Sequence, residues 1–208
     1  MRLFFAVKLS DEVNSRIAEA VGRMRSTAAE SARIRVSWVR EENLHVTLKF
    51  LGETAEAGLP EVREAGRLAA RAASIGEVVA RGVGSFPNET HARVLWVGLQ
   101  DSGGIIPRLA HDLEEHLEKK GFKRDPHGYT PHITVGRVKE GKGAGEIMFP
   151  FKRAAFGACA VTELLLMESV LEPGGSRYAV VDRFPLSGAL SDGSGAPEAS
   201  SKGGSGRS

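Results

Sequence analysis

The sequence has little of several features, and each shortage excludes a class of protein. A single cysteine, Cys159, excludes an internal disulfide and a zinc site built from several thiolates. No stretch approaches the ~18 consecutive apolar residues that a membrane-spanning helix needs. The apolar run near the N-terminus is short and is followed at once by Lys8 and Asp11, unlike a secretory signal. We therefore expect a cytoplasmic protein that does not contact a membrane.

The common signatures of metal and nucleotide sites are also missing. There is no His-Glu-x-x-His motif, and His111 and His116, five positions apart on a predicted helix, would face different directions. Residues 136–142 fit the first seven positions of a phosphate-binding P-loop. However, Gly143 stands where a Ser or Thr would hold magnesium, and no helical pattern follows. We therefore expect neither a metal nor a cofactor.

Charge and composition point to an ordinary globular chain. The formal net charge of +2 allows a local basic cleft but does not suggest a protein covered with cations for duplex DNA. The hydrophobic fraction of 41% over 208 residues is sufficient for a folded core. We expect one domain over residues 1–186. Residues 187–208 are rich in Gly, Ser and charge, and we expect them to form a disordered tail.

Apolar periodicity predicts a mixture of helices and strands. Helices are expected at 11–25, 57–73 and 104–120, with Ser10 as the N-cap of the first and Gly121 as the C-cap of the third. Strands are expected at 2–8, 34–39, 44–51, 77–86, 93–99, 131–138, 146–152, 159–168 and 177–184. The mixture predicts an α+β architecture.

One short motif occurs twice, as His45-Val46-Thr47 and as His132-Ile133-Thr134. Each copy lies in an alternating polar and apolar run, which predicts a strand. The period of two residues directs each imidazole and its hydroxyl to the same face, ~7 Å apart along the strand. In the first copy, strict alternation places Lys49 on the histidine face and Phe50 on the core face. Two such strands facing one another would form a single compact site.

The residue types in this pattern suit acid–base cleavage of a phosphate ester. Near neutral pH, one imidazole can be neutral and accept a proton while the other is protonated and donates one. Thr47 and Thr134 can donate hydrogen bonds to phosphate oxygens. A cation would stabilise the negative charge of the transition state, and the candidates are Lys49 and Arg137.

Several longer segments carry a resemblance to a known family. They are RLFFAVKL at 2–9, the run from Trp38 to Gly52, Ser-Phe-Pro at 85–87, Arg93–Gly98 and Tyr129–Arg137. In order through about residues 1–186, the chain resembles the 2H phosphoesterases. More narrowly, it resembles their RNA 2′,3′-cyclic phosphodiesterase branch, once named 2′-5′ RNA ligases.

The resemblance implies a bilobal α+β fold, with two similar lobes of antiparallel sheet and helices around a central cleft. It also implies metal-independent hydrolysis of a terminal 2′,3′-cyclic phosphate on RNA, or on a small cyclic nucleotide, to a 2′-phosphate. His45 would be the proton donor and His132 the proton acceptor. Thr47, Thr134 and Arg137 would bind the substrate.

Two other functions stay open at this point. The same groups could catalyse the reverse reaction, in which a 5′-hydroxyl opens the cyclic phosphate and forms a 2′-5′ linkage. Alternatively, the chain could be a non-catalytic module that binds RNA ends, although both histidines and both threonines are present. We expect a monomer in either case.

Overall fold

The computed structural model describes residues 1–31, 34–126, 128–140, 142–172 and 175–187. The helices are α1 (Asp11–Ser31), α2 (Leu59–Ala72), α3 (Ile105–Glu118) and α4 (Gly145–Met148). The strands are β1 (Arg2–Val7), β2 (Arg35–Trp38), β3 (Val46–Glu53), β4 (Gly76–Phe86), β5 (Val94–Gln100), β6 (His132–Lys139), β7 (Ala155–Val161), β8 (Glu163–Glu172) and β9 (Gly175–Pro185). The tail predicted at 187–208 lies, from residue 188 onward, outside the described residues.

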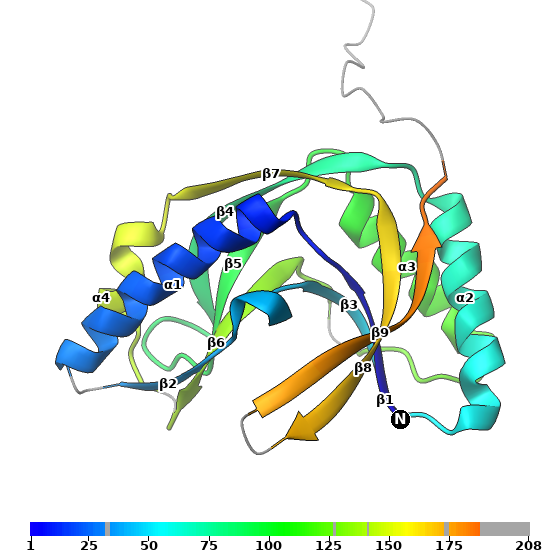
Figure 1. Cartoon of the computed structure of the whole chain (residues 1–208), viewed down its shortest axis with the longest axis horizontal. Coiled ribbons are helices and arrows are strands. Elements are labelled where there is room, and N and C mark those ends of the chain that lie inside the picture. The colour runs from blue at the N-terminus through cyan, green and yellow to red at the C-terminus, as the bar shows by residue number, and fades with distance from the viewer. Residues whose placement is uncertain (32–33, 127, 141, 173–174, 188–208) are drawn as a thin grey trace, which may run out of the picture.

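Within the described residues, all nine strands belong to one curled antiparallel sheet (Figure 1). Their order is β7-β4-β5-β6-β3-β1-β8-β9, and β2 pairs with β6 in addition. The strands that carry the two motifs, β6 and β3, are therefore neighbours at the centre, with three further strands outside each of them. The expected α+β architecture with two lobes of antiparallel sheet is confirmed, and the lobes share one continuous sheet.

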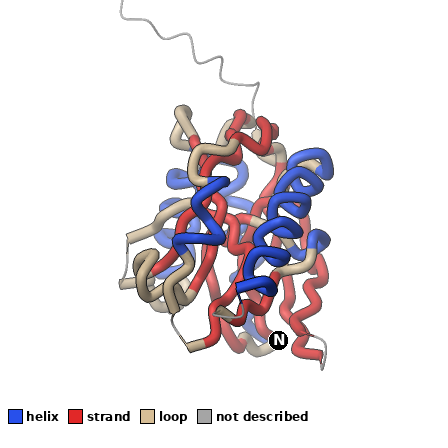
Figure 2. Tube along the Cα trace, turned by 90° about the vertical axis from the view of Figure 1, so that its left-hand side faces the viewer, coloured by secondary structure: helices blue, strands red, loops and turns tan. Residues whose placement is uncertain are grey.

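The helices pack on the sheet through their apolar faces. In α3, Ile105, Leu109, Leu113 and Leu117 recur at helical spacing and are buried, as the sequence predicts. Helix α2 packs against α3 and against β8 and β9, while α1 packs against β7 and β2. In the side view of Figure 2 the strands run between these helices. No helix within the described ranges has the length and apolar character needed to cross a membrane.

The predicted end signals of two helices are present. At the start of α1, the Ser10 Oγ accepts a hydrogen bond from the Val13 amide at 3.4 Å, as expected of an N-cap. Three residues after α3, Gly121 adopts a positive φ of 87°, which a residue with a side chain rarely adopts. These two local signals therefore mark the helix ends as the sequence predicts.

Two predicted strands differ from the structure. The strand predicted at 146–152 is wrong, because this segment forms α4 and a 3₁₀ turn from Phe149 to Phe151. Its apolar run is too short to distinguish strand from helix by periodicity, and Pro150 cannot donate to a strand ladder. The strand predicted at 159–168 is two strands, because β7 ends at Val161 and β8 begins at Glu163 on the other half of the sheet.

Candidate active site

The two motifs meet because their strands are adjacent. Within the described ladder between β3 and β6, the register pairs Val46 with Ile133, and both side chains are fully buried in the core. Their neighbours in sequence point to the opposite face. In an antiparallel pair this register sets His45 across from Thr134, and Thr47 across from His132. All four polar side chains line one cavity of about 660 Å³.

Both imidazole rings are held in the same way. The His45 Nδ1 lies 2.7 Å from the Asn43 carbonyl oxygen, and the His132 Nδ1 lies 2.7 Å from the Thr130 carbonyl oxygen. A carbonyl oxygen only accepts hydrogen bonds, so each Nδ1 carries a proton. Each Nε2 is therefore the nitrogen that can accept and release a proton in the cavity. The His45 Nε2 lies 3.0 Å from the Thr47 Oγ1.

Aromatic rings surround the two histidines and fix the planes of their imidazoles. The His45 ring lies 5.1 Å from the ring of Phe4 and 5.1 Å, edge to face, from that of Tyr178. The His132 ring lies 5.1 Å from the ring of Phe86, also edge to face. These aromatic residues come from β1, β9 and β4. No sequence motif marked Tyr178, because its strand pairs with β8, far from either motif in the chain.

Burial lowers the pKa of His45 below its ordinary value of 6.5. The positive charges of Lys8 and of a protonated His132 lower this pKa further, while the hydrogen bond to the Asn43 carbonyl opposes them. His45 is therefore neutral near pH 7 in this structure. A negatively charged ligand beside the ring would raise its pKa again.

A β-bulge follows the threonine in each motif strand. On β3, Ala6 pairs with Thr47 but Phe5 pairs with Lys49, so Leu48 is an extra residue. On β6, Thr134 pairs with Trp96 of β5 but Gly136 pairs with the next residue, Leu95, so Val135 is likewise an extra residue. Each bulge shifts the alternation by one residue.

The bulges decide which later side chains reach the cavity. Phe50 and Arg137, each five residues after the histidine of its motif, both line it. Arg137 therefore lies in the same cavity as the two motifs, and its role in binding the substrate stays a prediction. The expectation that Phe50 faces the core is wrong, because its side chain lies on the cavity side and the residue is 66% exposed.

Lys49 is not where strict alternation predicts. It pairs with the buried Phe5, and only 7% of it is exposed. Its Nζ donates to the Glu114 carboxylate at 2.6 Å and to the Lys123 carbonyl oxygen at 2.8 Å. The ammonium group is thus held by an ion pair with α3, although Lys49 also lines the cavity, and its role as the cation that stabilises phosphate charge stays a hypothesis.

The other candidate residues do not form a metal site. His111 lines the cavity, and its Nε2 lies 3.4 Å from the Glu115 carboxylate. Across the described part of the chain, no group of three or more His, Cys, Asp or Glu side chains is placed to hold a metal ion. The P-loop alternative also fails, since β6 continues through Lys139 where the loop would begin.

Comparison with known proteins places this geometry in a family. The model of the LigT-like phosphoesterases matches residues 9–96 and 98–178. The chain belongs to this family. The RNA 2′,3′-cyclic phosphodiesterase of Archaeoglobus fulgidus is 35% identical over 179 residues, 86% of this chain and 96% of that protein. The protein of the same name from Methanothermobacter thermautotrophicus is 32% identical, and the match covers 89% of this chain and 99% of that protein.

A solved structure agrees with this assignment. The crystal structure of the protein TT0787 of Thermus thermophilus has a TM-score of 0.74 and 31% sequence identity to the chain. The structural match covers 89% of this chain and 98% of the Thermus thermophilus chain. The LigT-like fold thus extends over the curled sheet and both motif strands.

Proposed function

We propose that this LigT-like phosphoesterase hydrolyses a terminal 2′,3′-cyclic phosphate on RNA and leaves a 2′-phosphate. The single observation that carries the proposal is the pair of histidine Nε2 atoms and the pair of threonine hydroxyls around one cavity. The names of the relatives from Archaeoglobus and Methanothermobacter support the choice of substrate.

The reaction needs one proton acceptor and one proton donor. In the proposed order, the neutral His132 Nε2 takes a proton from water as the water oxygen attacks phosphorus. The bond from phosphorus to the ribose O3′ breaks, and protonated His45 gives its Nε2 proton to O3′. The product has a 2′-phosphate and a 3′-hydroxyl, and the two histidines have exchanged protonation states. The resemblance supports this assignment of the two roles.

The lowered pKa of His45 makes its protonation depend on the substrate. A phosphodiester carries one negative charge, which favours the imidazolium form of a ring beside it. Binding of the substrate would therefore be accompanied by proton uptake on His45. The Thr47 hydroxyl, which contacts the His45 Nε2 in this structure, would then turn to a phosphate oxygen.

The remaining side chains have roles in binding. Thr47 and Thr134 would donate hydrogen bonds to the non-bridging oxygens, where negative charge accumulates in the transition state. The Arg137 guanidinium would neutralise part of that charge. The ring of Phe50 is exposed in the cavity and offers a surface on which a base can stack.

The test is an assay on a short RNA that ends in a 2′,3′-cyclic phosphate. We expect a product with a 2′-phosphate, identified by its resistance to an enzyme that removes only 3′-phosphates, and equal rates with and without EDTA. An RNA with a 5′-hydroxyl is added in a parallel reaction to measure any ligation. A wild-type protein that leaves the cyclic phosphate intact, or a product with a 3′-phosphate, would contradict the proposal.

A further inference from the structure

The buried ion pair of Lys49 and Glu114 belongs to the lining of the cavity, and the Lys49 ammonium is bound to the Glu114 carboxylate and to the Lys123 carbonyl oxygen. We propose that Lys49 is a positioning residue that holds the segment around Lys123–Asp125 and Gly128–Thr130 as one wall of the substrate cavity. This inference rests on the proposed function and adds a determinant of how tightly the substrate is bound.

The position of Lys49 follows from the bulge on β3. Because Leu48 is the extra residue, Lys49 pairs with the core residue Phe5 and its ammonium reaches Glu114 of α3, while the residue still lines the cavity. Its ammonium donates to the Glu114 Oε1 and to the Lys123 carbonyl, and the side chains of Lys49 and Glu114 are only 6% and 17% exposed. Charges taken out of water at this depth are tolerated only when they are paired and hydrogen-bonded.

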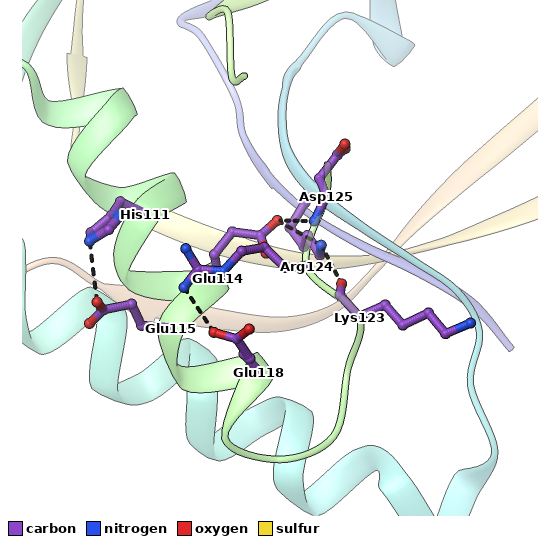
Figure 3. A network of polar contacts seen from close by, with 8 residues as sticks. His111, Glu114, Glu115, Glu118, Lys123, Arg124 and Asp125 are labelled. Carbon is purple, nitrogen blue, oxygen red and sulfur yellow. Dashed lines mark hydrogen bonds and ion pairs between the residues drawn. The ribbon is translucent and has the colours of Figure 1, made fainter. Parts of the chain in front are cut away.

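The segment that Lys49 contacts has no regular structure of its own. Neither helix nor strand occurs in residues 122–126 or 128–131. Figure 3 shows how it is fastened to α3: the Arg124 guanidinium donates to Glu118 at 2.9 Å, and the Asp125 amide donates weakly to the Glu114 Oε1 at 3.4 Å. The Glu114 carboxylate of α3 therefore binds both Lys49 of β3 and the irregular segment at Asp125.

The same segment lines the cavity and contacts both motifs. Arg124, Asp125, Gly128, Tyr129 and Thr130 all line it. The Tyr129 hydroxyl donates to the Thr47 carbonyl oxygen at 3.0 Å, and the Thr130 carbonyl accepts from His132. A cavity of about 660 Å³ is in the range of sites that enclose a whole small ligand. A displaced wall would therefore weaken binding of the substrate.

The wall touches one imidazole, through the Thr130 carbonyl that accepts from His132, and both rings have further contacts outside the wall: His45 with the Asn43 carbonyl and His132 with the ring of Phe86. His132 sits in the ladder with β5, opposite Gly98, and the charges that act on the pKa of His45 are those of Lys8 and His132. Loss of Lys49 should thus change binding of the substrate far more than proton transfer. A change in substrate binding without a change in proton transfer would distinguish a positioning role from that of a cation that stabilises the transition state.

The first variant is Lys49→Met, which keeps the length of the side chain and removes its charge. We expect KM for the cyclic-phosphate RNA to rise about tenfold or more, with kcat within about threefold of wild type. The pH profile of kcat should stay unchanged, and Lys49→Arg should recover much of the affinity, because a guanidinium can donate to both acceptors. Lys152→Met is the matched control, since Lys152 pairs with Glu89 on the surface at 2.8 Å, outside the cavity.

Lys49→Met leaves Glu114 buried without its cation and could fail to fold. The double variant Lys49→Met/Glu114→Leu removes both charges and keeps an apolar contact. A folded double variant that retains the raised KM supports the positioning role. A wild-type KM in that variant would overturn it, because the pair would then serve stability alone. A loss of kcat of about 100-fold at unchanged KM in Lys49→Met would overturn it as well.

Binding is measured alongside turnover so that the two proposals can fail separately. The probe is the RNA product with a 2′-phosphate, and its Kd is determined by fluorescence anisotropy for wild type and for each variant. If wild type binds the product but does not hydrolyse the cyclic phosphate, the proposed function fails and the Kd values still decide the role of Lys49. If wild type neither binds nor hydrolyses, both proposals fall.

Discussion

At the scale of single residues, burial decides how the His45 imidazole behaves. His45 is enclosed by Phe4 and Tyr178, and its Nδ1 is committed to the Asn43 carbonyl. Desolvation disfavours the charged ring more than this hydrogen bond favours it, so the pKa is lowered. The neutral form is therefore part of the folded state, and protonation of His45 must cost stability.

The sign of this cost gives a prediction for unfolding. The unfolded chain binds a proton on His45 with a pKa of 6.5, and the folded chain binds it only at lower pH. The contribution of His45 to stability is present above pH 6.5 and is lost as the pH falls through the folded pKa. We expect wild type to lose more unfolding free energy than His45→Gln between pH 7.5 and 5.5, by at most ~1.4 kcal/mol per pH unit. Equal slopes in urea titrations of the two proteins would contradict the lowered pKa.

The two threonine hydroxyls give a second prediction at this scale. Thr47→Val and Thr134→Val keep the shape of the side chain and remove its hydrogen-bond donor. If each hydroxyl stabilises phosphate charge in the transition state, each variant should lose ~10²–10³ in kcat. Thr27→Val, in α1 and outside the cavity, is the control and should keep full activity. Unchanged turnover in both motif variants would remove the threonines from the mechanism.

The sequence was informative about the motif residues and misleading just beyond them. Alternation correctly grouped His45 with Thr47 and His132 with Thr134, because the strands are regular over those three positions. It failed at Lys49 and Phe50, since no residue in the strand signals the extra position at Leu48. A bulge arises from pairing with a neighbouring strand, so local periodicity does not reveal it.

At the scale of elements, long periodic segments were predicted well and short apolar runs were not. Helices α1 and α3 follow from repeated apolar spacing, although α1 continues to Ser31, beyond the predicted end at residue 25. The apolar run at 146–152 fits a strand as well as a helix. The segment forms short helical turns, and these bury Ile147, Met148 and Phe151 in the core. Sequence order likewise did not show that β7 and β8 lie on opposite halves of the sheet.

Two helical glycines give opposite predictions for the same substitution. In α1, a Cβ added at Gly22 would meet nothing within 4 Å, so Gly22→Ala should stabilise the protein by ~0.5–1 kcal/mol. In α2, a Cβ at Gly66 would come within 2.7 Å of Phe5 Cε1 and 2.9 Å of Phe184 Cε2. Gly66→Ala should therefore force α2 away from the sheet and cost about 1–3 kcal/mol.

Thermal and urea unfolding of these two variants test how closely α2 sits on the sheet. We expect a higher midpoint for Gly22→Ala and a lower one for Gly66→Ala. A stabilising effect at both positions would mean that α2 has room for a methyl group above the rings of Phe5 and Phe184.

At the scale of the whole molecule, the site is formed where two halves of one sheet meet. Each half contributes a strand with the same histidine and threonine spacing, followed by a bulge and a further cavity residue, Phe50 or Arg137. The repeated motif let the sequence predict that two segments 87 positions apart, His45 to His132, share one site. The direct contact of β3 with β6 depends on the order of the strands in the sheet, and no local sequence pattern predicts that order.

The most direct measurement of the central claim is the turnover of two histidine variants against a histidine control. His45→Ala and His132→Ala each remove one proton-transfer group, and His91→Ala removes an exposed imidazole outside the cavity. With cyclic-phosphate RNA, each motif variant should lose ~10²–10⁴ in kcat/KM while staying folded, and His91→Ala should match wild type. Full activity in either folded motif variant would contradict the claim that both imidazoles act on one phosphate.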